Sequence, residues 1–290
     1  MLIFIRKDAN FTRENARQWP LLSKSAPPMD YQRALVAQPF ITQTFVPSIM
    51  PSKVTDGKTR RVLCLGLHGS TVNSFFSNLS TKYDVTAVDS EPALRYVAEK
   101  WFGFSETEQH RIFVENPVFY VVARAELMES GSGMCFTYYL INIFFVCAVT
   151  VPKHFDFIVV DVCYGLGAAE KSRIQCPVKE FEDEKVVIAL SKNLAPYGTI
   201  VMHFFSLSSK FDIPTQHQLA NHEHRILQLF KKHFGNCYFL SIGPHLLLTC
   251  TRRKQITRAA YITTFRSLPR ELQMYAENQE PKFFLDLEAP

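Results

Sequence analysis

The sequence predicts an α/β fold in which a doubly wound, mainly parallel sheet of seven strands ends in an antiparallel hairpin. Three observations support this prediction. Apolar strands alternate with amphipathic helices from Arg60 onward, a glycine turn follows the first strand, and acids end two other strands at Asp89 and Asp161. Such alternation is typical of parallel strands joined by right-handed crossovers.

The expected elements follow one another in a regular order. Strands are predicted at 61–65, 84–88, 111–114, 157–160, 199–204, 237–241 and 246–251, and helices at 30–37, 71–80, 92–101, 178–193 and 217–234. The last two strands are joined around Gly243-Pro244. This link is too short for a crossover, so they are expected to pair antiparallel.

Length and composition favour one large domain with extensions at both ends. The 290 residues are 47% hydrophobic and 20% charged, which excludes a disordered chain. We expect a lead-in at 1–58, the α/β domain at 59–254 with an apolar insertion at about 132–150, and a helical extension at 255–290.

The apolar insertion belongs to a run without any charge, residues 130–152, that is long enough to cross a bilayer. The strands before and after it belong to one predicted sheet, however, and strands cannot pair through lipid. We therefore expect no stable membrane insertion. The alternatives are a hydrophobic hairpin or helix packed on the domain, residues foreign to the ancestral fold such as translated non-coding sequence, or membrane association.

Charge and cysteine content indicate a cytoplasmic protein that does not bind nucleic acid. The formal net charge is +5 and the basic residues are scattered. The apolar stretch at the start of the chain is too short for a signal peptide. Seven cysteines without a C-x-x-C pair predict reduced thiols, and no metal site is predicted.

The glycine turn is the first candidate binding element. Gly66 and Gly69 allow the backbone to approach a ligand closely, and the helix that follows offers unpaired N–H groups. Asp89, about 20 residues further on, is placed to accept both ribose hydroxyls of an adenosine-bearing cofactor. The alternatives are that the glycines form only an ordinary tight turn and that Asp89 only caps the next helix.

Four segments together resemble a known family. They are 62–70 (VLCLGLHGS), 87–92 (AVDSEP), 98–105 (AEKWFGFS) and 155–161 (FDFIVVD). They are similar to the spermidine-synthase-like methyltransferase domains of class I, which have a Rossmann-like sheet. Within this family they resemble most the C-terminal half of the dual lysine and N-terminal methyltransferases of elongation factor 1-alpha.

The resemblance implies a methyltransferase that uses S-adenosylmethionine and acts on a protein amine, with the N-terminal amine of elongation factor 1-alpha as the tentative acceptor. It implies that Gly66, Gly69 and Asp89 hold the donor and that Asp161 steers the amine as the catalytic residue. Asn116 lies where the family carries an acid followed by glycine that holds the adenine; here Pro117 follows. Relatives of this fold often pair, so a homodimer is left open.

Departures from the family pattern leave other functions open. His68 replaces a glycine beside the expected donor, and Tyr164 replaces the second acid with which aminopropyltransferases deprotonate a polyamine. Polyamine synthesis is therefore the less favoured reaction. His203 is either a base or a plain strand-end histidine. A catalytically inactive relative that serves as a binding module is the main alternative.

Overall fold

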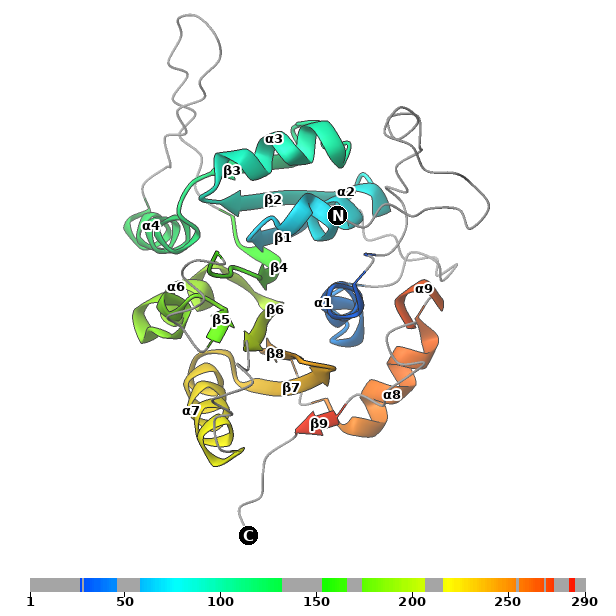
Figure 1. Ribbon diagram of the computed structural model, residues 1–290, viewed down its shortest axis with the longest axis vertical. Helices are drawn as coiled ribbons and strands as arrows, with labels where there is room; N and C mark the ends of the chain where they lie inside the picture. The colour runs from blue at the N-terminus through cyan, green and yellow to red at the C-terminus, as the bar shows by residue number, and fades with distance from the viewer. Residues whose placement is uncertain are drawn as a thin grey trace, which may run out of the picture.

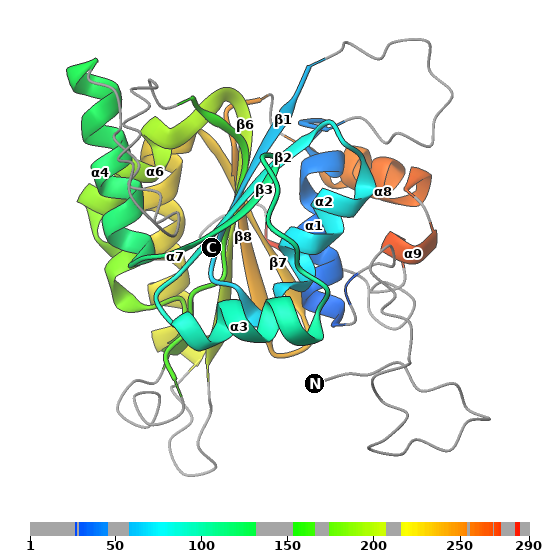
Figure 2. The same ribbon diagram turned by 90° about the horizontal axis from the view of Figure 1, so that it is seen from above.

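The computed structural model describes residues 27, 29–45, 58–131, 153–165, 174–206, 216–253, 256–268, 270–273 and 282–284. In this part of the chain one mixed sheet lies between two layers of helices (Figures 1 and 2). The predicted apolar insertion at 132–150 lies outside the described residues. Among the described helices, none has the length and apolar character needed to cross a bilayer.

The sheet contains the seven predicted strands in the order β3-β2-β1-β4-β6-β8-β7. The first five in this order run parallel, and β8 is antiparallel to both of its neighbours, as the short link predicted. Their bounds are β1 Arg60–Leu65, β2 Tyr83–Asp89, β3 His110–Val114, β4 Phe155–Val160, β6 Leu194–Ser206, β7 Asn236–Ile242 and β8 His245–Thr251. Two short strands add to it: β5 (Ile174–Cys176) pairs with β6, and β9 (Lys282–Phe284) pairs with β7.

Each face of the sheet is covered by its own layer of helices (Figure 2). One layer contains α4 (Pro117–Ser130), α6 (Glu184–Asn193) and α7 (Gln216–Phe234). The other contains α1 (Asp30–Ile41), α2 (Thr71–Leu79), α3 (Pro92–Trp101), α8 (Arg258–Ser267) and α9 (Arg270–Gln273). Two layers of helices on a largely parallel sheet give the predicted fold class.

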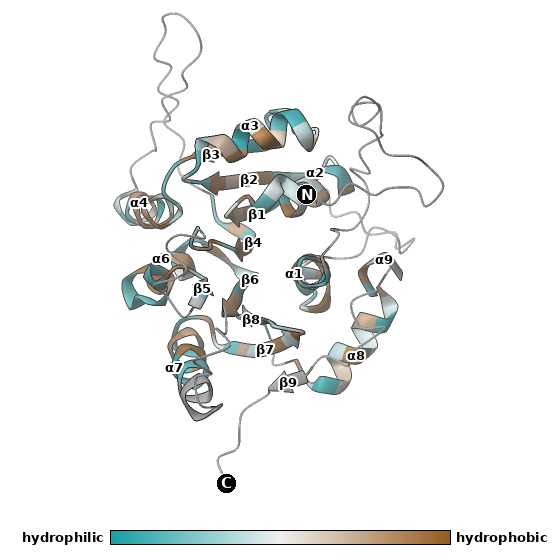
Figure 3. Cartoon of the chain, in the orientation of Figure 1, coloured by the Kyte–Doolittle hydropathy of each residue, from teal (hydrophilic) through white to brown (hydrophobic). Residues whose placement is uncertain are grey.

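Alternation along the strands divides the core into two clusters. In β1, Val62 and Cys64 belong to the cluster under α1 and α2, whereas Leu63 and Leu65 belong to the cluster under α4 and α6. The central strands are accordingly apolar on both faces, and in Figure 3 β2 and β4 are mostly brown. Full burial of one such side chain stabilises the fold by roughly 1.5–3 kcal/mol.

The expected N-terminal helix is confirmed and extends to Ile41. It belongs to the domain core, because Leu35 and Val36 are fully buried and Gln38 Oε1 accepts a 2.8 Å hydrogen bond from Tyr238 Oη in β7. At the other end of the chain, Tyr261 of α8 is fully buried in the same cluster. Helices from before and after the sheet in the sequence, α1 and α8, therefore both contribute to the layer that covers one face of the sheet.

Two local features differ from the sequence prediction. Helix α4 was not predicted, and the helix expected at 178–193 is divided into a 3₁₀ turn (Lys179–Glu182) and α6. The division falls at Asp183, whose Oδ1 accepts a 2.8 Å hydrogen bond from the Lys185 N–H. A side chain that caps the helix at this point fixes where α6 begins.

The prediction of reduced thiols is wrong for four of the seven cysteines. Cys163 bonds to Cys176, and Cys237 bonds to Cys250. The second pair lies directly opposite in the β7–β8 register, which the sequence spacing alone did not reveal. Cys64 is a free, buried thiol.

Candidate functional site

The glycine turn after β1 is held by close contacts that only glycine permits. Gly66 has φ +92°, and a Cβ there would lie 2.0 Å from the backbone oxygen of Asp161. Gly69 has φ +77°, and a Cβ there would lie 3.2 Å from the ring of Phe102. Phe102, in the 98–105 segment, therefore packs on the turn at a distance that favours glycine.

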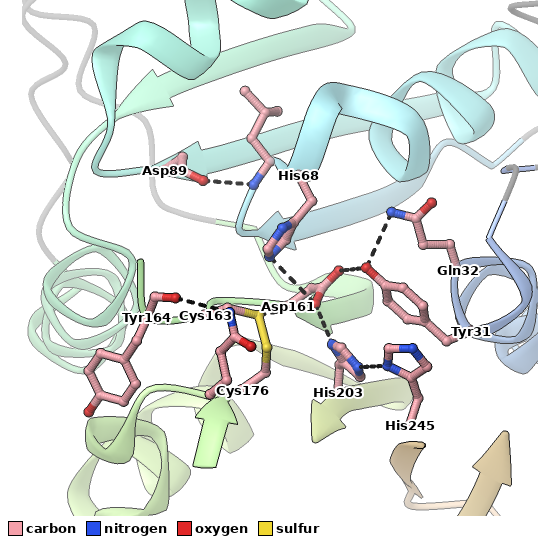
Figure 4. Close-up of polar contacts among 12 residues, drawn as sticks. Tyr31, Gln32, His68, Asp89, Asp161, Cys163, Tyr164, Cys176, His203 and His245 are labelled. Carbon is pink, nitrogen blue, oxygen red and sulfur yellow. Dashed lines mark hydrogen bonds and ion pairs between the residues drawn. A yellow bond between two sulfur atoms is a disulfide. The ribbon is translucent and has the colours of Figure 1, made fainter. Parts of the chain in front are cut away.

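Asp89 is fixed beside this turn, at the carboxyl end of β2. Its Oδ2 accepts a 2.8 Å hydrogen bond from the Leu67 N–H (Figure 4). Its Oδ1 accepts a 3.0 Å hydrogen bond from the Glu91 N–H. An ionised carboxylate has about four lone-pair sites. The two oxygens are therefore oriented by the backbone and each retains the capacity to accept a second hydrogen bond.

Asn116 follows β3, next to β2 at the same edge of the sheet. Its Oδ1 accepts hydrogen bonds from the N–H groups of Val118 (2.9 Å) and Phe119 (3.1 Å), so it caps α4, and Pro117 is the first residue of that helix. The ring of Phe119 is 62% exposed beside it. A local helix cap accounts for the conformation of Asn116, and its role toward adenine stays a prediction.

Asp161 follows β4 and lies at the centre of a buried polar network. It is only 2% exposed, and its Oδ1 lies 2.7 Å from Nδ1 of His203 in β6. The other nitrogen of that ring, Nε2, lies 2.8 Å from Nδ1 of His245, the first residue of β8. Three neighbouring strands thus supply a continuous chain of hydrogen bonds at the carboxyl edge of the parallel strands (Figure 4).

Tyr31 of α1 covers this chain. Its ring stacks on His203 and His245 with centroid distances of 4.3 and 4.4 Å, and its Oη lies 3.5 Å from Asp161 Oδ2. Gln32 Nε2 donates a 3.4 Å hydrogen bond to the same phenol oxygen. The predicted lead-in therefore places an aromatic side chain over the imidazoles.

His68 enters the network from the glycine turn. Its Nε2 lies 3.6 Å from Asp161 Oδ1, and its side chain is 37% exposed. The residue has φ +35°, a conformation that a histidine adopts at a cost. The side chain that stands where a glycine was expected thus reaches from the glycine turn toward Asp161.

The charges of this network follow from burial and from the neighbouring histidines. Burial raises the pKa of Asp161, but its electrostatic and hydrogen-bond interactions with His68 and His203 outweigh burial, so the pKa lies below its usual value. Burial and the nearby His203 lower the pKa of His245 to about 4. At neutral pH the carboxylate is ionised and the His245 ring is neutral.

Two residues of this network, Tyr31 and His245, were not singled out from the sequence. His245 could have been found by topology. The first residue of a strand that is antiparallel to β6 lies at the edge where β6 ends, so this residue could have been placed near His203. No sequence pattern could have placed Tyr31 in the network, because its position depends on how α1 packs on the sheet.

Comparison with known proteins bears on the fold. The sequence matches no protein-family model and no curated protein. Among solved structures it resembles human methyltransferase-like protein 13 in complex with SAH, with 17% identity, a TM-score of 0.62, and coverage of 84% of this chain and 93% of that chain. It also resembles a probable spermidine synthase from Corynebacterium glutamicum, with 16% identity, a TM-score of 0.58, and coverage of 87% and 73%. The chain therefore has the fold of the spermidine-synthase-like class I methyltransferases.

Proposed function

We propose that this protein is a methyltransferase that uses S-adenosylmethionine and acts on a protein amine. One observation carries the proposal. Asp89, beside the glycine turn, and the Asp161–His203–His245 chain lie at the same edge of the sheet, in the fold of a protein that was crystallised with SAH. Ligands of open α/β sheets bind at this edge, where the strands end.

The residues at the turn fit the adenosine and carboxylate ends of the donor. Asp89 has an oriented carboxylate with unused lone pairs for ribose hydroxyls. The Ser70 side chain does not cap α2, and the start of a helix favours an anionic group through its N–H groups and dipole. When bound, the sulfonium of the donor supplies an activated methyl group, and the protein has to align the amine and keep it unprotonated.

The histidine chain is arranged to take the amine's proton. If His203 Nδ1–H donates to Asp161, then His203 Nε2 accepts from His245 Nδ1–H, and His245 Nε2 is left to accept a proton. A proton that arrives there displaces the Nδ1 proton of His245 toward His203. The resulting imidazolium is paired with the buried Asp161 carboxylate.

Polyamine transfer has less support at this site. Tyr164 stands where aminopropyltransferases carry their second acid, and its Oη accepts a 2.9 Å hydrogen bond from the Lys179 N–H. A phenol is a poor base at neutral pH. Sequence resemblance makes the N-terminal amine of elongation factor 1-alpha the first acceptor to test, which would place the reaction in the cytoplasm.

A second candidate function is a binding module without catalysis. Two contacts favour it: His68 lies 3.6 Å from Asp161 on one side, and the Tyr31 phenol lies 3.5 Å from it on the other. Both side chains lie against the carboxylate at which the proposed proton relay ends.

Calorimetry with S-adenosylmethionine separates the two candidates. We expect binding that weakens at least about 10-fold in Asp89→Ala, because two charge-assisted hydrogen bonds to the ribose are lost. Asp156→Ala is the matched control. Asp156 also accepts a 2.8 Å hydrogen bond from a backbone N–H, that of Arg61, but it lies at the start of β4.

The acceptor is then identified with a labelled methyl group. Transfer to an N-terminal peptide of elongation factor 1-alpha, and none to polyamines, supports the proposed reaction. A folded protein that binds no S-adenosylmethionine would contradict the methyltransferase proposal and favour the binding module.

A further inference from the structure

The Cys163–Cys176 disulfide lies against the buried carboxylate and its histidines. Cys163 follows Asp161 by two residues, and its Sγ is 3.9 Å from Asp161 Oδ1. The ligand atoms of Cys163, Cys176 and His203 all lie within 4.8 Å of one another. A second group, formed by His68, Asp161 and Cys163, meets the same limit and shares one sulfur with the first (Figure 4).

The other disulfide provides an internal comparison. Cys237 and Cys250 also lie 13 positions apart, but they pair across β7 and β8 within an apolar cluster. Neither of them belongs to a group of metal-binding side chains among the residues that the structure describes. The polar surroundings are therefore specific to the first disulfide and do not come with cysteine pairing itself.

We propose that the reduced protein binds Zn²⁺ through the thiolates of Cys163 and Cys176 and a nitrogen of His203. Two thiolates and an imidazole are a common zinc ligand set. Ligand atoms of a tetrahedral zinc site lie roughly 3–4 Å apart, so the present separations need only small shifts once the S–S bond has opened. Asp161 Oδ1, at 2.7 Å from His203 and 3.9 Å from Cys163, offers a fourth donor.

Reduction of the Cys163–Cys176 disulfide forms this site. A dithiol reductant transfers two electrons and two protons to the S–S bond, which gives two thiols and the disulfide of the reductant. Zinc then displaces both thiol protons to solvent. His68, whose side chain is 37% exposed, borders this site at Asp161.

Zinc binding also has a consequence for methyl transfer, and this consequence depends on the proposed function. The metal occupies His203, which is needed to receive the proton from His245. The site thus accepts either a proton or a metal ion. Oxidation to the disulfide prevents metal binding and leaves the histidine chain intact.

The test measures metal on the full chain, independently of activity. The protein is reduced with a phosphine, because dithiols themselves bind zinc; the phosphine takes up the oxygen of one water, whose two protons complete the thiols. After incubation with zinc and desalting we expect about one zinc ion per reduced chain, and none per oxidised chain. Cobalt in place of zinc should give the absorption of tetrahedral, thiolate-bound Co²⁺.

Two double variants decide whether the metal lies at this site. Cys163→Ser with Cys176→Ser should lose the zinc, whereas Cys237→Ser with Cys250→Ser, matched in spacing, should keep it. In the unmodified protein, zinc should slow alkylation at Cys163 and Cys176 specifically. A reduced chain that takes up no zinc, or a metal that protects other cysteines and not these two, would overturn the proposal.

Discussion

The proposed donor side of this site, at Asp89, and its proposed acceptor side, at Asp161, are built in different ways. At the donor side, Asp89 is held by backbone N–H groups 22 and 2 positions away, and it is half-buried. At the acceptor side, Asp161 is 2% exposed and meets side chains 42 and 130 positions away. Local hydrogen bonds orient the first carboxylate, whereas the packing of three strands and one helix creates the environment of the second.

This difference separates a binding element from a chemical one. A half-buried carboxylate held by backbone groups is suited to accept hydrogen bonds from a ligand that comes and goes. A buried carboxylate paired with imidazoles is suited to hold positive charge away from water. The two sides meet where Gly66 passes the backbone oxygen of Asp161.

The largest expected effect comes from a change at that meeting point. Gly66→Ala should destabilise the protein by more than about 4 kcal/mol, because its Cβ would lie 2.0 Å from a backbone oxygen. The control is Gly131→Ala, which has φ +65° but no atom of the described residues within 4 Å of the new Cβ; it should cost about 1 kcal/mol. Denaturant unfolding compares them, and equal costs would show that the two sides are not in contact.

The next effect separates chemistry from binding. Asp161→Asn keeps the size of the side chain but removes the charge that stabilises the His203 imidazolium. We expect the methyl-transfer rate to fall about 100-fold while the affinity for S-adenosylmethionine stays within a few-fold. Asp89→Ala should show the opposite pattern. If both variants lost affinity equally, the division into donor and acceptor sides would be wrong.

The third prediction concerns a buried histidine, His110, for which the described residues show no carboxylate partner. His110 Nε2 lies 2.9 Å from Asn73 Nδ2, its ring meets Phe104, and burial together with neighbouring Arg111 lowers its pKa from 6.5 to about 4. As the pH falls, His110 is therefore protonated in the unfolded chain before it is protonated in the folded protein. Stability should be highest above pH 6.5 and fall by up to about 3 kcal/mol toward pH 4.

His110→Gln keeps a partner for Asn73 but does not titrate. Denaturant unfolding at intervals from above pH 6.5 down to pH 4 should therefore show a flatter curve for this variant than for the unmodified protein. Parallel curves would mean that His110 is not the source of the acid sensitivity.

The smallest effect tests the side chain that lies between the two sides. His68→Gly removes the imidazole near Asp161 and the positive φ of a non-glycine residue, and we expect it to tighten S-adenosylmethionine binding by about 10-fold. Stability should change by no more than about 1 kcal/mol, because the released strain is offset by the greater freedom of glycine when unfolded. Ser70→Gly, also at positive φ, is the control for strain alone. Weaker binding in His68→Gly would show that the imidazole contacts the donor.

The features that depend on residues close together in the sequence could be predicted from the sequence. The seven strands, the glycine turn and the acids at the ends of β2 and β4 each depend on apolar periodicity and turn chemistry within a few residues. Helix α4 was missed because it leads directly into the uncharged run at 130–152. That run has no helical periodicity, so the sequence pattern does not mark where the helix ends. The disulfides were missed because equal spacing of 13 residues says nothing about register.

The sequence by itself determined the alternation of strands and helices and the edge of the sheet at which Asp89 and Asp161 lie. Only the tertiary structure decided that Asp161 meets His203, His245 and Tyr31, and that Cys163 bonds to Cys176. The reason is physical. Backbone preferences act between near neighbours, whereas contacts across 42 or 130 positions depend on strand order, register and helix packing.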